Sequence, residues 1–246
     1  MDVYHLSQKE HACMSVTLDC AKLTTREINT SIKRLALEGE TEIHLVNPDA
    51  RHSLGVAVFD PITIVVEGTA GYFCGAMNDG ASFHILGNTG WSAGECMLSG
   101  EIVVERNAAS GTGASIRGGT VVVKGHVGAR TGIAQKGGLI VIGGDTGYMT
   151  GFMMQRGTMI ICGNAAEGLG DSMYAGTIYL GGEPNQLGND AVIKEMTGED
   201  TRFLAETLEK YGLSSKRKLS DFKKIGSGGR LHNFSKADFE LWRVAM

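Results

Sequence analysis

The sequence predicts an all-β fold: a single-stranded parallel β-helix of about seven 19-residue coils, with short flanking helices at both ends. Three observations indicate it. The chain contains 36 glycines against 3 prolines, and 28 of these glycines lie between Gly68 and Gly182. The glycines recur every 19 residues without an insertion over six steps, and aliphatic residues share that period. Nineteen residues are too few for a helical repeat, so each repeat fits one coil of short strands separated by glycine corners.

Two columns of glycine mark the corners of the predicted coils. The first column comprises Gly75, Gly94, Gly113, Gly132, Gly151 and Gly170. The second comprises Gly68, Gly87, Gly125, Gly144, Gly163 and Gly182, with Arg106 in the remaining position. Glycine is favoured where φ is positive or where another backbone comes too close for a Cβ atom. We therefore predict that these glycines are structural corners and that Arg106 forms an exposed local bulge.

Three aliphatic columns follow the same period and form the predicted strands. Two of them are spaced by two residues and therefore point to one face of a strand, the interior of the rod. Their members are Ile64, Phe83, Ile102, Val121, Ile140, Met159 and Ile178, and Val66, Ile85, Val104, Val123, Ile142, Ile161 and Leu180. The outward column between them is also mostly apolar, and it comprises Val65, His84, Val103, Val122, Val141, Ile160 and Tyr179. Because an exposed apolar stripe would promote aggregation, we predict that flanking segments of the chain or a partner subunit cover it.

The chain divides into three predicted segments. These are residues 1–50, a flanking segment with one helix; residues 51–190, the β-helix; and residues 191–246, a C-terminal helix and docking tail. In the first segment, Thr24 and Glu27 form a capping-box pattern, which predicts a helix over Leu23–Leu37. A strand is expected over Glu42–Val46, before an Asn-Pro turn.

The C-terminal segment begins with a predicted helix over Asp200–Tyr211, which ends at Gly212. The basic stretch Lys216–Lys224 is expected to be a solvated surface loop, although it could also dock on an acidic partner. Gly226–Gly229 is expected to be a flexible link. The tail Phe234–Val244 carries large apolar side chains, so we predict that it docks on the rod or on a neighbouring subunit.

Charge and composition argue against several classes of protein. The net charge is -4, whereas a nucleic-acid-binding protein usually carries a basic excess. No apolar stretch approaches the roughly 20 residues that span a bilayer, and residues 1–10 do not resemble a secretion signal. We therefore expect a cytoplasmic protein with no nucleic acid or membrane as a partner. The five cysteines are scattered and form no C-x-x-C pair, which disfavours a metal site.

Residues that could carry chemistry are dispersed along the chain. His84 and His126 are isolated, and no histidine pair has the spacing of a zinc site. Glu95 and Asp171 share a column but lie four coils, or about 19 Å, apart. A pair of glycosidase carboxylates needs about 5–10 Å. The glycine motifs lead into strands rather than helices, unlike a dinucleotide-binding loop. We therefore predict no catalytic, cofactor-binding or metal-binding residue in this chain.

The 19-residue glycine coil resembles the C-terminal domain of the glutamate synthase large subunit, known as the GXGXG domain. The resemblance covers the chain from about Arg26 to Tyr211, and its most specific part is Cys162–Tyr174, with the sequence CGNAAEGLGDSMY, followed by Thr177–Gly182. This part and the turn Leu187–Asp190 are similar to free-standing GXGXG subunits, of which the N-methylglutamate synthase type is the nearest. The resemblance implies a right-handed β-helix.

The resemblance also implies a function. In this family the β-helix contributes no catalytic residue and holds two other parts in fixed relation: a class II glutamine amidotransferase subunit and an FMN-dependent synthase subunit. FMN, with an iron–sulfur cluster as a further option, is expected in partner subunits and not in this chain. We therefore expect a scaffold subunit of a glutamine-dependent oxidoreductase complex, and homo-oligomerisation within that complex stays open.

Two alternatives remain from the sequence. The β-helix subunit of formylmethanofuran dehydrogenase shares the same glycine coil, although the flanking helices fit it less well. An independent enzyme on a β-helix, such as a polysaccharide lyase, is the third hypothesis. Its candidate residues are Glu95, His126 and Asp171. Fold analogy alone does not establish which of the three functions applies.

Overall fold

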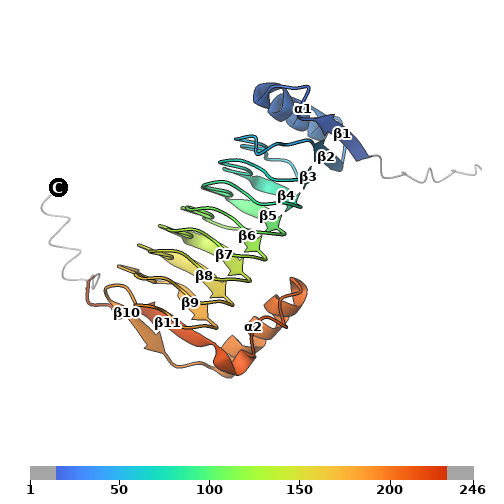
Figure 1. The fold of residues 1–246 in the computed structure, drawn as a ribbon. Coiled ribbons are helices and arrows are strands. Elements are labelled where there is room, and N and C mark those ends of the chain that lie inside the picture. The colour runs from blue at the N-terminus through green and yellow to red at the C-terminus, as the bar shows by residue number, and fades with distance from the viewer. Residues whose placement is uncertain (1–14, 232–246) are drawn as a thin grey trace, which may run out of the picture.

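The computed structural model describes residues 15–231, and its dominant feature is a parallel β-solenoid (Figure 1). The predicted fold class is confirmed, because these residues are mostly β, with about seven solenoid turns and two short α-helices. One 11-stranded sheet runs along the whole rod. The sheet therefore continues through all three sequence segments, whose boundaries stay a prediction.

The bounds of the strands are β1 Ser15–Asp19, β2 Glu42–Val46, β3 Thr63–Glu67, β4 Asp79–Ile85, β5 Ser99–Val104, β6 Thr120–Val123, β7 Lys136–Ile142, β8 Arg156–Ile161, β9 Thr177–Leu180, β10 Ala191–Lys194 and β11 Lys223–Ser227. From β3 to β9 the paired strand cores follow the offset that the 19-residue period predicts. β1 to β9 are parallel neighbours in chain order, so that Ile64 pairs with Phe83 and Phe83 with Ile102. The two inward columns are buried along their whole length and form the core.

Each arch from β3 to β9 holds a run of three alternate residues with positive φ, and within this run only the middle one is always glycine. In one arch these residues are Arg130, Gly132 and Ala134. A Cβ atom on Gly132 would lie 2.4 Å from the Cε atom of Met159, inside the core. The Arg130 side chain is exposed, so the only unfavourable contribution at this residue is the left-handed backbone conformation, about 1–2 kcal/mol. Packing and φ together therefore require glycine in the first column.

The second glycine column reflects close approach between neighbouring coils. A Cβ atom on Gly163 would lie 2.4 Å from the carbonyl group of Gly144 in the preceding coil. Arg106 occupies the same column with its side chain exposed, and its φ is not positive. The Gly125 N–H still donates to the Arg106 carbonyl at 2.8 Å, and β5 and β6 pair without a register shift. The predicted bulge at Arg106 is therefore wrong, because the side chain fits without one.

Helix α1 (Thr25–Leu37) closes the N-terminal end of the rod core (Figure 1). The predicted capping box is confirmed: Thr24 accepts the Glu27 N–H, and the Glu27 carboxylate accepts the Thr24 N–H. The buried face of the helix consists of Ile28, Ile32 and Leu35, which pack in the main core. The Asn29 side-chain oxygen also accepts the Gly55 N–H at 2.8 Å, which fastens the helix to the first arch.

The C-terminal end is closed by two antiparallel strands, and here two predictions are wrong. Lys216–Lys224 is not a solvated loop, because it contains a short 3-10 helix, η1 (Leu219–Asp221), and the start of β11. Gly226 is not part of a flexible link, because it pairs with Val192 of β10. The two lysines at its start hid this strand, in which Ile225 is buried against β9.

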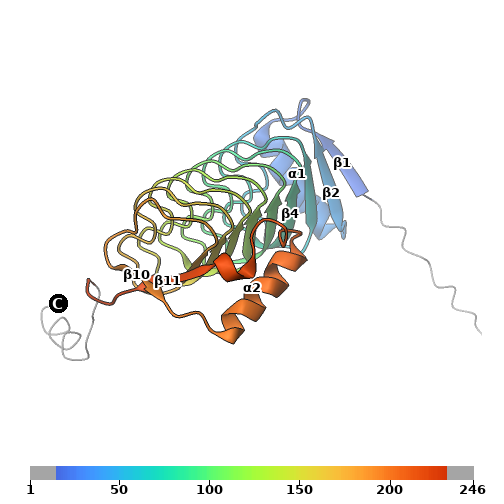
Figure 2. The same ribbon diagram turned by 60° about the horizontal axis from the view of Figure 1, so that its bottom comes forward.

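Helix α2 (Gly198–Lys210) lies along the outer face of the strands (Figure 2). It is about 20 Å long, which matches the about 19 Å of four coil steps. Helix α2 buries the C-terminal half of the outward column, in which Val122, Val141 and Ile160 are fully buried. The predicted cover is thus supplied by this chain, although only over half the rod. The predicted docking tail Phe234–Val244 lies outside the described residues. Neither α-helix within residues 15–231 has the length and apolarity that a membrane span requires.

Candidate interaction surface

Two of the residues singled out for chemistry, His126 and Asp171, make hydrogen bonds that link parts of the rod. His126 belongs to a ladder along one corner of the rod, in which a side chain in each coil accepts the backbone N–H of its equivalent in the next coil. The ladder comprises Thr69, Asn88, Asn107, His126, Asp145, Asn164 and Glu183. His126 accepts the Asp145 N–H through its Nδ1 atom at 3.0 Å, so this nitrogen is not free to act as a base. The period of 19 contains this column too, but it was missed because its members differ in type.

Asp171 is buried and fully engaged at the end of the rod. One carboxylate oxygen accepts the backbone N–H and side-chain amide of Asn189 at 3.0 and 2.9 Å, and the other accepts the Ser172 hydroxyl at 2.7 Å. Glu95 lies four coils away on the same column. The structure therefore does not bring Glu95, His126 and Asp171 together. Within residues 15–231, no three His, Cys, Asp or Glu side chains are grouped so that they could hold a metal ion.

Three of the described cysteines, Cys20, Cys74 and Cys162, are buried and are poor nucleophiles. Burial raises the pKa of the Cys74 thiol to about 12 and that of the Cys162 thiol to about 11. A thiol with such a pKa is protonated at neutral pH and reacts slowly.

A polar lock fastens α2 and β11 to the outer face. The Asp200 carboxylate accepts hydrogen bonds from the Tyr179 hydroxyl and from the Lys224 ammonium group, whose Nζ lies 2.9 Å away. Burial opposes ionisation of Asp200, but the hydrogen bonds from Tyr179, Thr197 and Lys224 outweigh it and hold its pKa well below the usual range. Burial, followed by the hydrogen bond to Asp200, raises the pKa of Tyr179. At the other end of α2, the Tyr211 hydroxyl donates to Glu101 at 2.7 Å.

The N-terminal half of the same outer face is not covered by α2. Val65 is half-buried and His84 is exposed, whereas the half-buried Val103 packs at the edge of the cluster beneath α2. Both nitrogens of the His44 ring face carboxylates, that of Glu42 at 2.9 Å and that of Glu67 at 2.7 Å. These two hydrogen bonds, with Glu42 the larger, raise the pKa of His44. This half of the face is therefore polar and open to solvent or to a partner.

Exposed apolar side chains gather on the same N-terminal coils. Seven of the twelve large apolar side chains exposed in residues 15–231 lie between Phe59 and Leu98, and they are Phe59, Tyr72, Phe73, Met77, Leu86, Trp91 and Leu98. On the arches, the rings of His52, Tyr72 and Trp91 form a continuous stack, which we call the aromatic stack. Its ring centroids are 4.2 and 5.2 Å apart, close to the spacing of coils. Exposed aromatic side chains of this kind are typical of protein–protein contacts.

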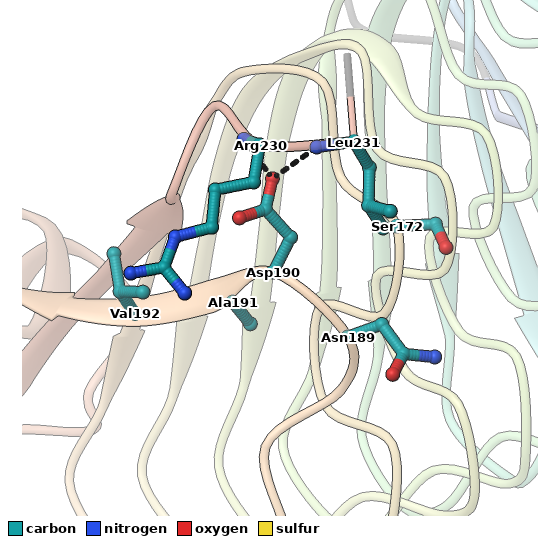
Figure 3. Close-up of a pocket in the computed structure, with 7 residues that line it drawn as sticks. All are labelled: Ser172, Asn189, Asp190, Ala191, Val192, Arg230 and Leu231. Carbon is teal, nitrogen blue, oxygen red and sulfur yellow. Dashed lines mark hydrogen bonds between the residues drawn. The ribbon is translucent and has the colours of Figure 1, made fainter. Parts of the chain in front are cut away.

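A pocket of about 560 Å³ lies at the C-terminal end of the rod (Figure 3). It is lined by Ser172, Asn189, Asp190, Ala191, Val192, Arg230 and Leu231. The Asp190 carboxylate accepts the backbone N–H groups of Arg230 and Leu231 at 2.8 and 3.2 Å (Figure 3). Asp190 therefore fixes the segment after β11 against the last coil and stabilises this end of the rod.

The chain was compared with known protein families, curated proteins and solved structures. No known family model matches the sequence. The chain is 45% identical over 220 residues to Protein GlxC of Rhizobium meliloti (strain 1021), and the match covers 89% of this chain and 96% of GlxC. The chain belongs to the GlxC family. This GlxC-family chain also resembles one chain in the crystal structure of the formyltransferase/hydrolase complex FhcABCD from Methylorubrum extorquens with methylofuran. The TM-score is 0.50 at 25% identity, over 64% of this chain and 70% of that chain.

Proposed function

We propose that this chain is the architectural subunit of a glutamine-dependent complex of the glutamate-synthase type, nearest to N-methylglutamate synthase. In this proposal it holds a class II glutamine amidotransferase subunit and an FMN-dependent synthase subunit in fixed relation. FMN, with an iron–sulfur cluster as a further option, belongs to the partners. The chain itself supplies no catalytic group.

Three lines support this function. The GXGXG resemblance covers most of the chain, and the chain belongs to the GlxC family. A solved structure of similar fold is one chain of a multi-subunit complex. The residues that could carry chemistry are either buried in structural hydrogen bonds or isolated from one another.

The single observation that carries the proposal is the aromatic stack. Trp91 is 56% exposed and Tyr72 is 39% exposed, although both rings are large and apolar. Stacking on one another and on His52 holds the rings rigidly, so little side-chain entropy would be lost on binding. Rigid, exposed tryptophan and tyrosine side chains are enriched among the residues that dominate binding energy at protein interfaces.

Co-purification from the native host tests the proposal. The tagged full-length chain should bring down an amidotransferase subunit and a synthase subunit, identified by mass spectrometry, and the eluate should show a flavin absorbance band. The double variant Tyr72→Ser with Trp91→Ser should lose at least one of these subunits, because the aromatic stack would no longer fill the interface.

Tyr148→Ser is the matched control. Tyr148 occupies the same column three coils further along and is 47% exposed, so the same chemical change is made outside the aromatic stack. This variant should retain the partners, and circular dichroism should show that all variants are folded. A tagged wild-type chain that elutes alone and without a flavin band would remove the proposal.

A second candidate is a subunit of a complex that handles formyl groups. It is favoured by the resemblance to one chain of the formyltransferase/hydrolase complex and agrees with the formylmethanofuran dehydrogenase alternative from the sequence. The same co-purification separates the two. Formyltransferase or hydrolase subunits, or a metal–pterin cofactor, in place of an amidotransferase and FMN would favour this second function.

A further inference from the structure

Charge is divided along the rod. Residues 52–105 contain no lysine or arginine, and their acidic residues are Asp60, Glu67, Asp79, Glu95, Glu101 and Glu105. Residues 106–156 contain one acidic residue, Asp145, and their basic residues are Arg106, Arg117, Lys124, Arg130, Lys136 and Arg156. Since each coil advances the rod by only about 4.8 Å, an acidic zone and a basic zone are neighbours along the rod.

One line of side chains crosses from the acidic zone into the basic zone. It runs along the corner that leads from the arches into the strands, and we call it the corner column. Its members after the first each donate a backbone N–H, at 2.8–2.9 Å, to a carbonyl group of the preceding coil, which places them at equivalent positions. In order along the rod they are Phe59, Asp79, Leu98, Arg117 and Lys136. The sheet shifts register at this corner, so that the Cα partner of Asp79 is Ser99, the neighbour of Leu98.

The corner column is accessible and its centre is apolar. Leu98 is 44% exposed and Phe59 is 65% exposed. Asp79 and Arg117, one coil to either side of Leu98, are also exposed. Met77, two residues before Asp79, adds a further exposed apolar side chain at this corner. An apolar centre flanked by opposite charges is the pattern of an interface that is complementary to itself.

We propose that two copies of this chain associate side by side and antiparallel through their corner columns, about a two-fold axis at Leu98. In this arrangement Leu98 packs on Leu98 of the second copy. Asp79 of each copy then meets Arg117 of the other, so this opposite-charge pair forms twice, and Phe59 of each copy meets Lys136 of the other. Parallel association would instead place like charges opposite each other.

The order of residues favours a second copy as the occupant. Reversal of the column exchanges Asp79 with Arg117 and leaves Leu98 in place, so the surface complements itself without any further partner. The Asp79 carboxylate is held by the Ser99 hydroxyl at 2.7 Å, and the Lys136 Nζ donates to the Ala134 carbonyl at 3.2 Å, which orients both charges. This inference goes beyond the architectural role and stands without it, since it concerns the chain alone.

Sedimentation equilibrium of the purified full-length chain tests the inference. The wild-type chain should form a dimer that weakens at high salt, because exposed ion pairs are screened. Arg117→Glu and Asp79→Lys should each weaken self-association by roughly tenfold or more, because each places like charges opposite each other twice in the dimer. An equimolar mixture of the two variants should recover dimerisation, since only the mixed dimer restores both opposite-charge pairs.

The recovery in the mixture distinguishes a lost contact from a damaged fold, because a misfolded variant would not regain it. Lys33→Glu makes the same change in net charge as Arg117→Glu at an exposed position on α1, and it should leave dimerisation unchanged. A wild-type chain that stays monomeric at low salt would overturn the proposal and leave the corner column to a different subunit. Two variants that fail to associate in the mixture would overturn it as well.

Discussion

The two halves of the outer strand face have the same backbone but opposite surroundings. From Val122 to Tyr179 the outward column is buried beneath α2 and the segment that follows it. From Val65 to Val103 the same column is half-buried or exposed, with His84 among its members. Strand pairing is parallel in both halves, and each half contains one register shift, between Asp79 and Ser82 in β4 and between Lys136 and Leu139 in β7. The exposure of the outward side chains therefore depends on whether α2 packs over them and not on the β-helix itself.

The polar groups in the two halves follow from this difference. In the covered half, the Asp200 carboxylate of α2 is nearly buried, and its charge is balanced by the Lys224 ammonium group and by hydrogen bonds. On the open half, the charged groups near His44 remain partly in water. Because water screens exposed pairs, a charge in the covered half should contribute far more to stability than one in the open half.

The largest expected effect comes from Asp200→Asn. This change keeps the size and one oxygen of the side chain but leaves the Lys224 ammonium group without its carboxylate. The free energy of unfolding, measured with urea at neutral pH, should fall by about 3 kcal/mol. Asp221→Asn, an exposed change in the same segment, should stay within about 0.5 kcal/mol.

The pH dependence of the Asp200 effect follows from the lowered pKa. A carboxylate whose folded pKa is depressed stabilises the protein above its unfolded pKa and loses this contribution as the pH falls through the folded value. The difference between wild type and Asp200→Asn should therefore shrink in acid. A difference that is equal at neutral and acid pH would show that the charge is not the cause.

A matched pair in the outward column tests the cover directly. Val141→Thr places a hydroxyl in a fully buried position beneath α2 and should cost about 1–3 kcal/mol. Val65→Thr makes the same change at the equivalent place in the open half, where water can bind the hydroxyl, and should cost less than about 0.5 kcal/mol. Thermal or urea unfolding of both variants measures the two costs. Equal costs would contradict the distinction between the halves.

The smallest effect is expected at His44. Its raised pKa, caused by Glu42 and then by Glu67, means that its contribution is fully present below the ordinary value of 6.5. The contribution is lost as the pH rises through the folded pKa. His44→Gln should therefore lower the free energy of unfolding by less than about 1 kcal/mol at roughly pH 5.5 and by almost nothing at roughly pH 9. A larger loss at the higher pH would show that the imidazolium is not the stabilising species.

Local patterns predicted most of the fold because the rod is built from nearest-neighbour contacts. The capping box at Thr24 and the strand Glu42–Val46 were found at their predicted places, and the strands repeat every 19 residues as expected. The predicted helix over Asp200–Tyr211 begins two residues earlier, at Gly198, because Thr197 caps it.

The interaction surface was harder to predict than the fold. Tyr72 and Trp91 are separated by 19 residues, so the period placed them in one column, but a column with only two adjacent aromatic members does not stand out. The sequence predicts a loop over Lys216–Lys224 from its charge and a flexible link over Gly226–Gly229 from its glycines, whereas Lys223–Ser227 forms β11. Its pairing with β9 and β10 depends on segments distant in the chain, and no local pattern reports that.

The sequence by itself determined the coil. Equivalent residues of successive coils stack on one another, so the same residue type must recur every 19 residues, and that repeat is visible in the sequence. Tertiary structure alone decided which half of the outer face is covered. An apolar outward column requires a cover, but the position of α2 depends on the lock between Tyr179, Asp200 and Lys224. These residues lie in three different elements, and only the folded chain brings them within hydrogen-bonding distance.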